Sequence, residues 1–183
     1  MKLRGLLTPL FFTLLTVGIF TSCKKDTPNN PWDDYDLEEQ LKIDAKIIED
    51  YIAENDIDAE NVAVENSEGE AVETGIYVAV TDSSHSEVYP NSDSLVEVKY
   101  KGYFTNGDVF EDTGDESIKF LLGQVIVGWR IGFTAVAEGD KATIIIPSPY
   151  AYGPVGAGPI GPNEVIIFDV ELIKVSNGNI SDL

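Results

Sequence analysis

Regular alternation of apolar and polar side chains constrains this fold more than any other feature of the sequence. Between residues 165 and 175, one series of alternate positions is wholly apolar and the other contains two acids: Ile166, Phe168, Val170 and Leu172 against Ile167, Asp169, Glu171 and Ile173. The same period recurs where Val96, Val98 and Tyr100 alternate with Glu97, Lys99 and Lys101. Successive side chains of a strand point to opposite faces, so the pattern predicts strands with one face on a core and one in solvent.

Turn residues and shorter apolar runs complete the expected sheet. Asn106-Gly107 predicts a tight hairpin over 105–108, because both residues readily adopt positive φ, and the return strand begins at Val109-Phe110. Further strands are expected at 76–80, 118–122 and 142–146, and one short helix at 127–136. Several antiparallel strands with one short helix indicate an α+β domain.

A separate amphipathic helix is expected ahead of this domain, at residues 36–55. Its apolar stripe has spacings of 4, 7 and 4, with acids such as Asp44 off the stripe: Leu37, Leu41, Ile48 and Ile52. We expect the helix to pack on its own domain in a monomer, and pairing with a second copy is the alternative. The stretch 60–73 is acidic and poor in bulky apolar residues, so a mobile connector is expected there.

The first residues have the layout of an export signal. Lys2 and Arg4 precede an apolar run, 6–20, that is shorter than the about 20 residues a membrane-spanning helix needs. The run ends in Thr21-Ser22-Cys23, which resembles the lipobox of bacterial lipoproteins and implies cleavage before Cys23 and acylation of that cysteine. The alternative is an ordinary cleaved signal followed by an unrelated cysteine. We expect an outer-membrane lipoprotein that faces the periplasm or the cell surface, held on the membrane by its lipid.

Charge and residue counts exclude several classes of site. A formal net charge of -20 repels phosphate backbones, so no nucleic-acid partner is expected. Cys23 is the only cysteine, which rules out a disulfide within the chain. With His85 as the only histidine, a zinc site or a Cys-His nucleophilic pair has too few candidate residues, and no metal or cofactor is expected.

Four short strings carry a family resemblance along residues 95–175. They are Tyr100-Lys101-Gly102, Asn106-Gly107-Asp108-Val109-Phe110, Gly123-Gln124-Val125-Ile126-Val127-Gly128-Trp129, and Pro149-Tyr150-Ala151-Tyr152-Gly153 with Phe168-Asp169-Val170-Glu171-Leu172. In this order they resemble the FK506-binding family of peptidyl-prolyl cis-trans isomerases. The resemblance implies a strongly twisted antiparallel sheet wrapped around a short helix, with an aromatic-walled active site between them.

The resemblance also implies a role for each matching residue. The aromatic walls and floor of the catalytic site would be Tyr100, Phe110, Trp129 and Phe168. The backbone N–H of Ile126 and the hydroxyl of Tyr152 would hold the substrate carbonyls. Val125 would enter the helix beside the substrate, and Ile160 would form an apolar lip.

Two positions depart from the family pattern. Glu111 follows Phe110 where the family usually has Asp, so either the catalytic carboxylate is displaced by one methylene or the register shifts to Asp112. Ile118 stands where an aromatic side chain often closes the pocket. These departures predict reduced activity and weaker binding of the macrolide inhibitor, with the fold unaffected.

The chain therefore divides into five expected regions: signal peptide (1–22), acidic tether (23–36), N-terminal helix and connector (37–72), isomerase domain (73–176) and tail (177–183). We expect a peptidyl-prolyl isomerase that acts on proline-containing polypeptides and assists the folding of exported proteins in the cell envelope. The alternative is a chaperone or adaptor lipoprotein that binds proline-containing segments without turnover.

Overall fold

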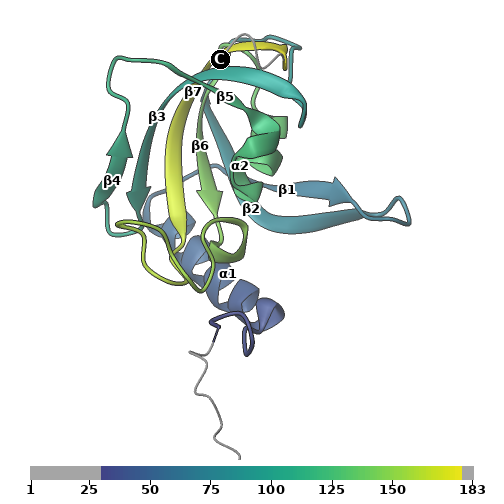
Figure 1. Ribbon diagram of the computed structural model, residues 1–183. Helices are drawn as coiled ribbons and strands as arrows, with labels where there is room; N and C mark the ends of the chain where they lie inside the picture. Colours follow the sequence, from purple (N-terminus) through teal and green to yellow (C-terminus); the bar gives the residue numbers. More distant parts are fainter. Residues whose placement is uncertain (1–29, 179–183) are drawn as a thin grey trace, which may run out of the picture. The chain divides into compact units, whose positions relative to one another are not determined.

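A computed structural model describes residues 30–178, and the predictions made for the signal peptide and for Cys23 lie outside these residues. The residues from Pro31 onward form one compact unit built on an antiparallel sheet (Figure 1). Its helices are α1 (Leu37–Glu54) and α2 (Val127–Gly132), with 3-10 turns η1 (Leu122–Gln124), η2 (Phe133–Ala135) and η3 (Ser148–Tyr150). Its strands are β1 (Glu60–Glu65), β2 (Ala71–Asp82), β3 (Ser94–Phe104), β4 (Val109–Asp112), β5 (Ile118–Leu121), β6 (Lys141–Ile146) and β7 (Ile166–Asn177).

The strands join in the order β1-β2-β6-β7-β3-β4, and β5 also pairs with β3, beyond the end of β4. The long central pair is β3 with β7, whose register runs from Ser94 opposite Asn177 to Phe104 opposite Ile166. The predicted α+β class is therefore confirmed, as are the strands expected from alternation. Among residues 30–178, no helix combines the length and the apolar character needed to cross a membrane.

One face of the sheet packs against α2. The alternate residues of β6 and β7 on this face, including Ile144, Ile146 and Phe168, are buried in the main core together with α2. The helix approaches β6 closely because glycines face the strand: a Cβ added at Gly128 would lie 2.3 Å from Ile146 Cγ2, and one at Gly132 would lie 2.7 Å from Ile144 Cγ2. This close approach determines how deep the rest of α2 sits.

The opposite face of the same strands packs against α1. Ile145, Val165 and Ile167 are buried with Ile48 in a second apolar cluster. The prediction that this helix packs on its own domain is confirmed. The expected stripe is wrong in detail, because Leu37 is 50% exposed whereas Asp44, expected off the stripe, is fully buried. Hydrogen bonds to a distant turn explain how a carboxylate can occupy that position.

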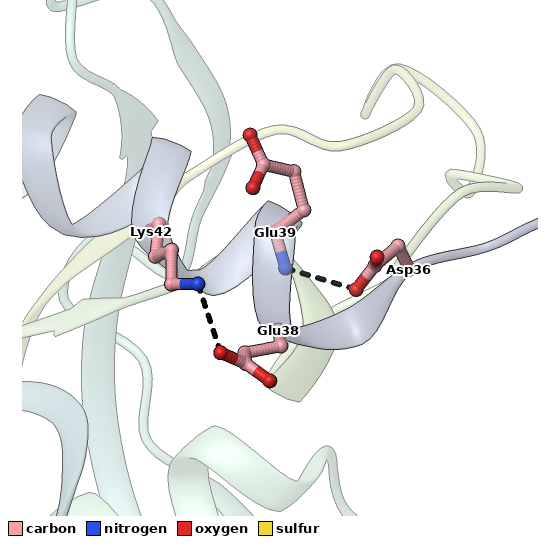
Figure 2. Close-up of polar contacts among 4 residues, drawn as sticks. All are labelled: Asp36, Glu38, Glu39 and Lys42. Atoms are coloured by element: carbon pink, nitrogen blue, oxygen red, sulfur yellow. Dashed lines mark hydrogen bonds and ion pairs between the residues drawn. The ribbon is translucent and has the colours of Figure 1, made fainter.

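The start of α1 is fixed by its own side chains. Asp36 is the N-cap, and its Oδ1 accepts a hydrogen bond of 3.0 Å from the Glu39 N–H (Figure 2). Lys42, one turn further on, forms an ion pair with Glu38, with Nζ 2.8 Å from Oε1. Acids in the first turn also interact favourably with the helix dipole, so local side chains favour a helix that begins at this point.

The expected mobile connector at 60–73 is wrong, because this stretch forms most of a β-hairpin. β1 pairs with β2, and Val64 lies opposite Val72. Val62 packs on the main core, and its carbonyl accepts a 2.7 Å hydrogen bond from Thr74 Oγ1. The acids of the hairpin lie in solvent, so its acidic composition did not prevent strand pairing through the backbone. The turn of the hairpin projects away from the rest of the sheet (Figure 1).

The hairpin predicted at Asn106-Gly107 is present between β3 and β4, with a different geometry. Gly107 has φ +88, while Asn106 does not have a positive φ. Asn106 instead accepts a 2.9 Å hydrogen bond from the Asp108 N–H through its Oδ1. The side chain of Asn106 thus stabilises the turn where the prediction relied on its backbone.

Candidate active site

A cavity of about 300 Å³ lies between the start of α2 and the strands β3, β5 and β7. Its lining is mostly aromatic and aliphatic, and four of its side chains, two of them tyrosines, carry a hydroxyl, carboxylate or amide group: Tyr100, Glu111, Phe120, Gln124, Val125, Ile126, Trp129, Tyr152 and Phe168. Seven of these nine are residues that the sequence predicted for the site. An apolar cavity with a few convergent polar groups is the usual form of a small binding site.

Trp129 is the centre of the cavity's aromatic wall. Its ring meets three other cavity-lining rings edge-on, with centroid distances of 5.1 Å to Tyr100, 5.0 Å to Phe168 and 5.5 Å to Phe120, and it meets Phe133 behind the wall at 5.3 Å. Aromatic pairs prefer this edge-to-face geometry, which stabilises the wall beyond the burial of its surface. Trp129 is only 4% exposed, and its indole Nε1–H has no hydrogen-bond partner among residues 30–178. A buried donor without a partner costs about 1–3 kcal/mol, which a bound acceptor can offset.

The beginning of α2 presents backbone groups to the same cavity. The Ile126 carbonyl accepts hydrogen bonds from Trp129 N at 3.1 Å and Arg130 N at 3.2 Å, which starts the helix. Ile126 itself and Val125 are still extended, so they line the cavity ahead of the first turn. The Ile126 N–H has no partner in the described part of the chain. It is available to donate to an oxygen of a bound ligand.

The polar side chains of the cavity form an interacting set. Burial raises the pKa of Tyr100, and the neighbouring Glu111 carboxylate raises it further. Burial also raises the pKa of Tyr152, and the negative charge of Glu111 raises it further. Both phenols therefore remain protonated at neutral pH, and Tyr152 can act as a hydrogen-bond donor.

Three predicted site residues do not line the cavity. Phe110 packs edge-on against Phe168 at 5.6 Å, with its ring over Gly102, so it supports the wall from outside. Ile160, expected at the lip, is buried in the main core and 7% exposed. Ile118 is 40% exposed. None of the three is among the residues that bound the cavity.

Two lining residues were missed by the sequence analysis, Phe120 and Gln124. Phe120 is two residues beyond Ile118 on β5, so both share one face of that strand. The alternation of β5 could have indicated Phe120, and the wall keeps an aromatic side chain where Ile118 had been expected to replace one. Gln124 stands beside Val125, within a string that had already been singled out.

The sequence resembles proteins of one family. The family model described as FKBP-type peptidyl-prolyl cis-trans isomerase matches residues 86–173. FK506-binding protein 1 of Candida glabrata is 39% identical over 112 residues, which cover 58% of this chain and 98% of that protein. The probable FKBP-type peptidyl-prolyl cis-trans isomerase FkpA of Neisseria meningitidis serogroup B is 38% identical over 117 residues, covering 61% of this chain and 43% of that protein.

Solved structures agree with these sequence matches. The crystal structure of a peptidyl-prolyl cis-trans isomerase from Pseudomonas syringae pv. tomato superposes with a TM-score of 0.59 at 28% identity, covering 79% of this chain and 98% of that one. FkpA from Escherichia coli gives a TM-score of 0.58 at 28% identity, covering 78% of this chain and 63% of that one. The structural match extends over more of the chain than the family model does.

Proposed function

The chain belongs to the FKBP-type peptidyl-prolyl cis-trans isomerase family, and from this premise we propose that the cavity beside α2 is its catalytic site. The substrate is a proline-containing polypeptide, and the reaction is rotation about the bond that precedes proline. The proposal rests mainly on one observation: an apolar, aromatic cavity is bounded by two hydrogen-bond donors, the Ile126 N–H and the Tyr152 hydroxyl.

The residues of the cavity suit the chemistry of this rotation. Amide resonance keeps the bond planar behind a barrier of about 18–20 kcal/mol. A twisted amide loses that resonance and much of its charge separation, so an apolar site favours it relative to the planar form, which water solvates better. The reaction needs no nucleophile and no proton transfer. The protein contributes shape, exclusion of water and fixed hydrogen bonds.

We assign each side chain a part in this process. Trp129 and Phe168 enclose the proline ring, with Phe120 as the third wall. The Ile126 N–H and the Tyr152 hydroxyl hold the carbonyl groups on the two sides of the rotating bond. The Glu111 carboxylate, whose interaction raises the pKa of Tyr100, keeps that phenol protonated on the wall.

The FK506-binding relatives suggest a competitor for this cavity. We propose that macrolides of the FK506 type bind the same residues, with lower affinity where Glu111 replaces the shorter Asp of the family. A macrolide that displaces the peptide would support a shared site.

Export and lipidation remain part of the proposal. The basic start, the apolar run and Cys23 support a lipoprotein of the cell envelope that assists the folding of exported proteins. Membrane fractionation of cells expressing the wild type and Cys23→Ser tests this. We expect the wild type in the membrane fraction and the variant in the soluble envelope fraction, and equal partition of both would contradict lipidation at Cys23.

Exchange NMR on short X-Pro peptides tests the catalytic proposal. We expect the purified chain to accelerate cis/trans exchange, and an FK506-type macrolide to abolish the acceleration. Peptide binding without acceleration would contradict catalysis and favour the proline-binding chaperone or adaptor. Neither binding nor acceleration by a folded chain would overturn both.

A further inference from the structure

The loop that carries Tyr152 is anchored by a part of the chain that lies outside the family match. The match covers residues 86–173, whereas α1 precedes it. We propose that Asp44 on α1 is a positioning residue for the isomerase reaction: it fixes the turn η3 and thereby the position of Tyr152. This inference rests on the proposed function, since Tyr152 is the donor assigned there to the substrate.

Asp44 is joined to η3 by two short hydrogen bonds. Its Oδ2 accepts one from the Ser148 N–H and one from Ser148 Oγ, each at 2.7 Å. Its Oδ1 accepts a third, at 2.8 Å, from Gln40 Nε2 within α1. Asp44 and Ser148 are both fully buried. Because a buried carboxylate is unfavourable without partners, this set of bonds tolerates few other placements of the turn.

Ser148 passes this constraint to both neighbours of Tyr152. Its carbonyl accepts hydrogen bonds from Ala151 N at 3.0 Å and Gly153 N at 2.9 Å. The residues on either side of Tyr152 are therefore held by the residue that Asp44 holds. Tyr152 enters the cavity from a backbone fixed at both ends.

A second contact comes from the segment that leads into α1. Gly153 has φ +56, and a Cβ added there would lie 2.7 Å from Cη2 of the Trp32 ring. Trp32 thus lies directly against the backbone that follows Tyr152. Two independent contacts from residues 32–44 converge on a single short loop.

Docking of α1 does not by itself require Asp44. Ile48 already packs with Ile145, Val165 and Ile167, which attaches the helix to the sheet. The carboxylate contributes something that apolar packing lacks, a directed connection to one turn. A positioning role and a purely stabilising role therefore predict different results.

A double-mutant cycle on the full chain in detergent separates these roles. Asp44→Ala, Tyr152→Phe and the double variant are compared by kcat/KM for an X-Pro peptide and by denaturant unfolding. We expect Asp44→Ala to lower kcat/KM about tenfold in the wild type and less than twofold in the Tyr152→Phe background, a coupling of about 1 kcal/mol or more. Its effect on unfolding should be the same in both backgrounds. An equal fold-loss of activity in both backgrounds, or stability loss with unchanged activity, would overturn the proposal.

Ile48→Val is the matched control, because it weakens the docking of α1 without touching Ser148. We expect it to lower stability and to change kcat/KM less than twofold. A tenfold activity loss in this control would show that any loosening of α1 is sufficient, and would also overturn the assignment. If Asp44→Ala does not fold, Ser148→Ala takes its place in the double-mutant cycle, because it removes one of the two hydrogen bonds between Ser148 and Asp44. We then expect a two- to threefold loss of kcat/KM.

Amide hydrogen exchange keeps this test independent of the proposed function. The Ala151 and Gly153 amides should exchange at least tenfold faster in Asp44→Ala, or in Ser148→Ala if that variant replaces it, than in the wild type. Unchanged exchange would overturn the proposal even where the wild type is an active isomerase. Absence of wild-type catalysis, with faster exchange in the variant, would overturn the proposed function while retaining the connection from Asp44 to the loop.

Discussion

The central strands β6 and β7 carry apolar residues on both faces, and the two faces are packed differently. Beside α2, Phe168 and its neighbours meet aromatic rings edge-on at 5.0–5.9 Å, and a cavity of about 300 Å³ remains. Beside α1, Ile145 and Ile167 meet Ile48, and all three are fully buried. The rings beside α2 meet in the geometry that aromatic pairs prefer and border a cavity, whereas the branched aliphatic side chains beside α1 are closely packed. We therefore place catalysis beside α2 and expect the face beside α1 to contribute stability and, through Asp44, the position of one loop.

The largest difference between the faces is expected for the tryptophan at the cavity wall. Trp129→Leu removes the edge contacts of the indole with four neighbouring rings and its surface in the cavity. We expect a loss of about 2 kcal/mol of transition-state stabilisation, which is a roughly 30-fold lower kcat/KM. Phe133→Leu is the control, since Phe133 is fully buried next to Trp129 but does not line the cavity. We expect it to lower stability with less than threefold loss of activity. Similar activity losses in the two variants would remove the distinction between wall and core.

A methyl group placed between α2 and the sheet tests the depth of that helix. Gly128→Ala puts a Cβ against Ile146 and should destabilise the fold by about 1–3 kcal/mol. Because α2 then moves outward next to Trp129, we expect kcat/KM to fall about tenfold, an amount worth about 1.4 kcal/mol. Gly161→Ala is the control, as its added Cβ would meet only the Glu164 side chain, at 3.4 Å. A stability loss without loss of activity in Gly128→Ala would contradict the link between helix depth and catalysis.

Two adjacent isoleucines allow the same substitution on opposite faces. Ile146 lies beside Gly128 of α2, and Ile145 packs with Ile48 of α1, so each is changed to valine. Each should lower the free energy of unfolding by about 0.5–1.5 kcal/mol. We expect kcat/KM to fall about twofold only in Ile146→Val, an effect of about 0.4 kcal/mol. Equal activities of the two variants, measured on the folded fraction, would contradict a different role for the two faces at these residues.

Alkaline pH should lower the stability of packing on both faces of the sheet, through a buried tyrosine on each. Only the tyrosine beside α2 should also affect catalysis. Burial raises the pKa of Tyr100 beside α2, with Glu111 adding to it, and burial raises the pKa of Tyr103 on the α1 side, with the charge of Asp169 adding. A folded-state pKa above the unfolded value of about 10 means that stability is fully present below pH 10 and is lost as pH rises through the folded-state pKa.

Denaturant unfolding from pH 7 to 11 measures this loss. Tyr100→Phe and Tyr103→Phe should each make the alkaline decline shallower, and only Tyr100→Phe should change kcat/KM. A decline of the same slope in the wild type and both variants would contradict the raised pKa values.

The sequence predicted those features in which local pattern and structure agree. Alternation placed β3 and β7, and the spacing of apolar residues placed α1 at 36–55, one residue beyond each end of the observed helix. The resemblance located most of the cavity, since its strings fall at the elements that meet there. At β5 it selected Ile118 when Phe120, two residues on, lines the wall. A short sequence string can predict which strand lines the cavity. Which residue of that strand lines it depends on side-chain packing, which the string does not contain.

The features that were missed depend on partners distant in the sequence. Asp44 was placed in solvent because its partner, Ser148, lies 104 residues further along the chain. The β1–β2 hairpin was missed because its acidic side chains point to water while its backbone and Val62 attach it to the sheet. The composition of such a segment indicates which side chains face solvent, but it does not indicate whether the backbone pairs with another strand.

Titration of the 15N-labelled chain with an X-Pro peptide tests whether the substrate binds in the cavity beside α2, because one experiment observes both faces of the sheet. We expect the Ile126 amide, the Trp129 indole N–H and the Tyr152 amide to shift progressively with peptide concentration. The amides of Ile48, Ile145 and Ile167 should remain in place. Shifts confined to the α1 face, or absent from the cavity residues at saturating peptide, would contradict the assignment of the active site.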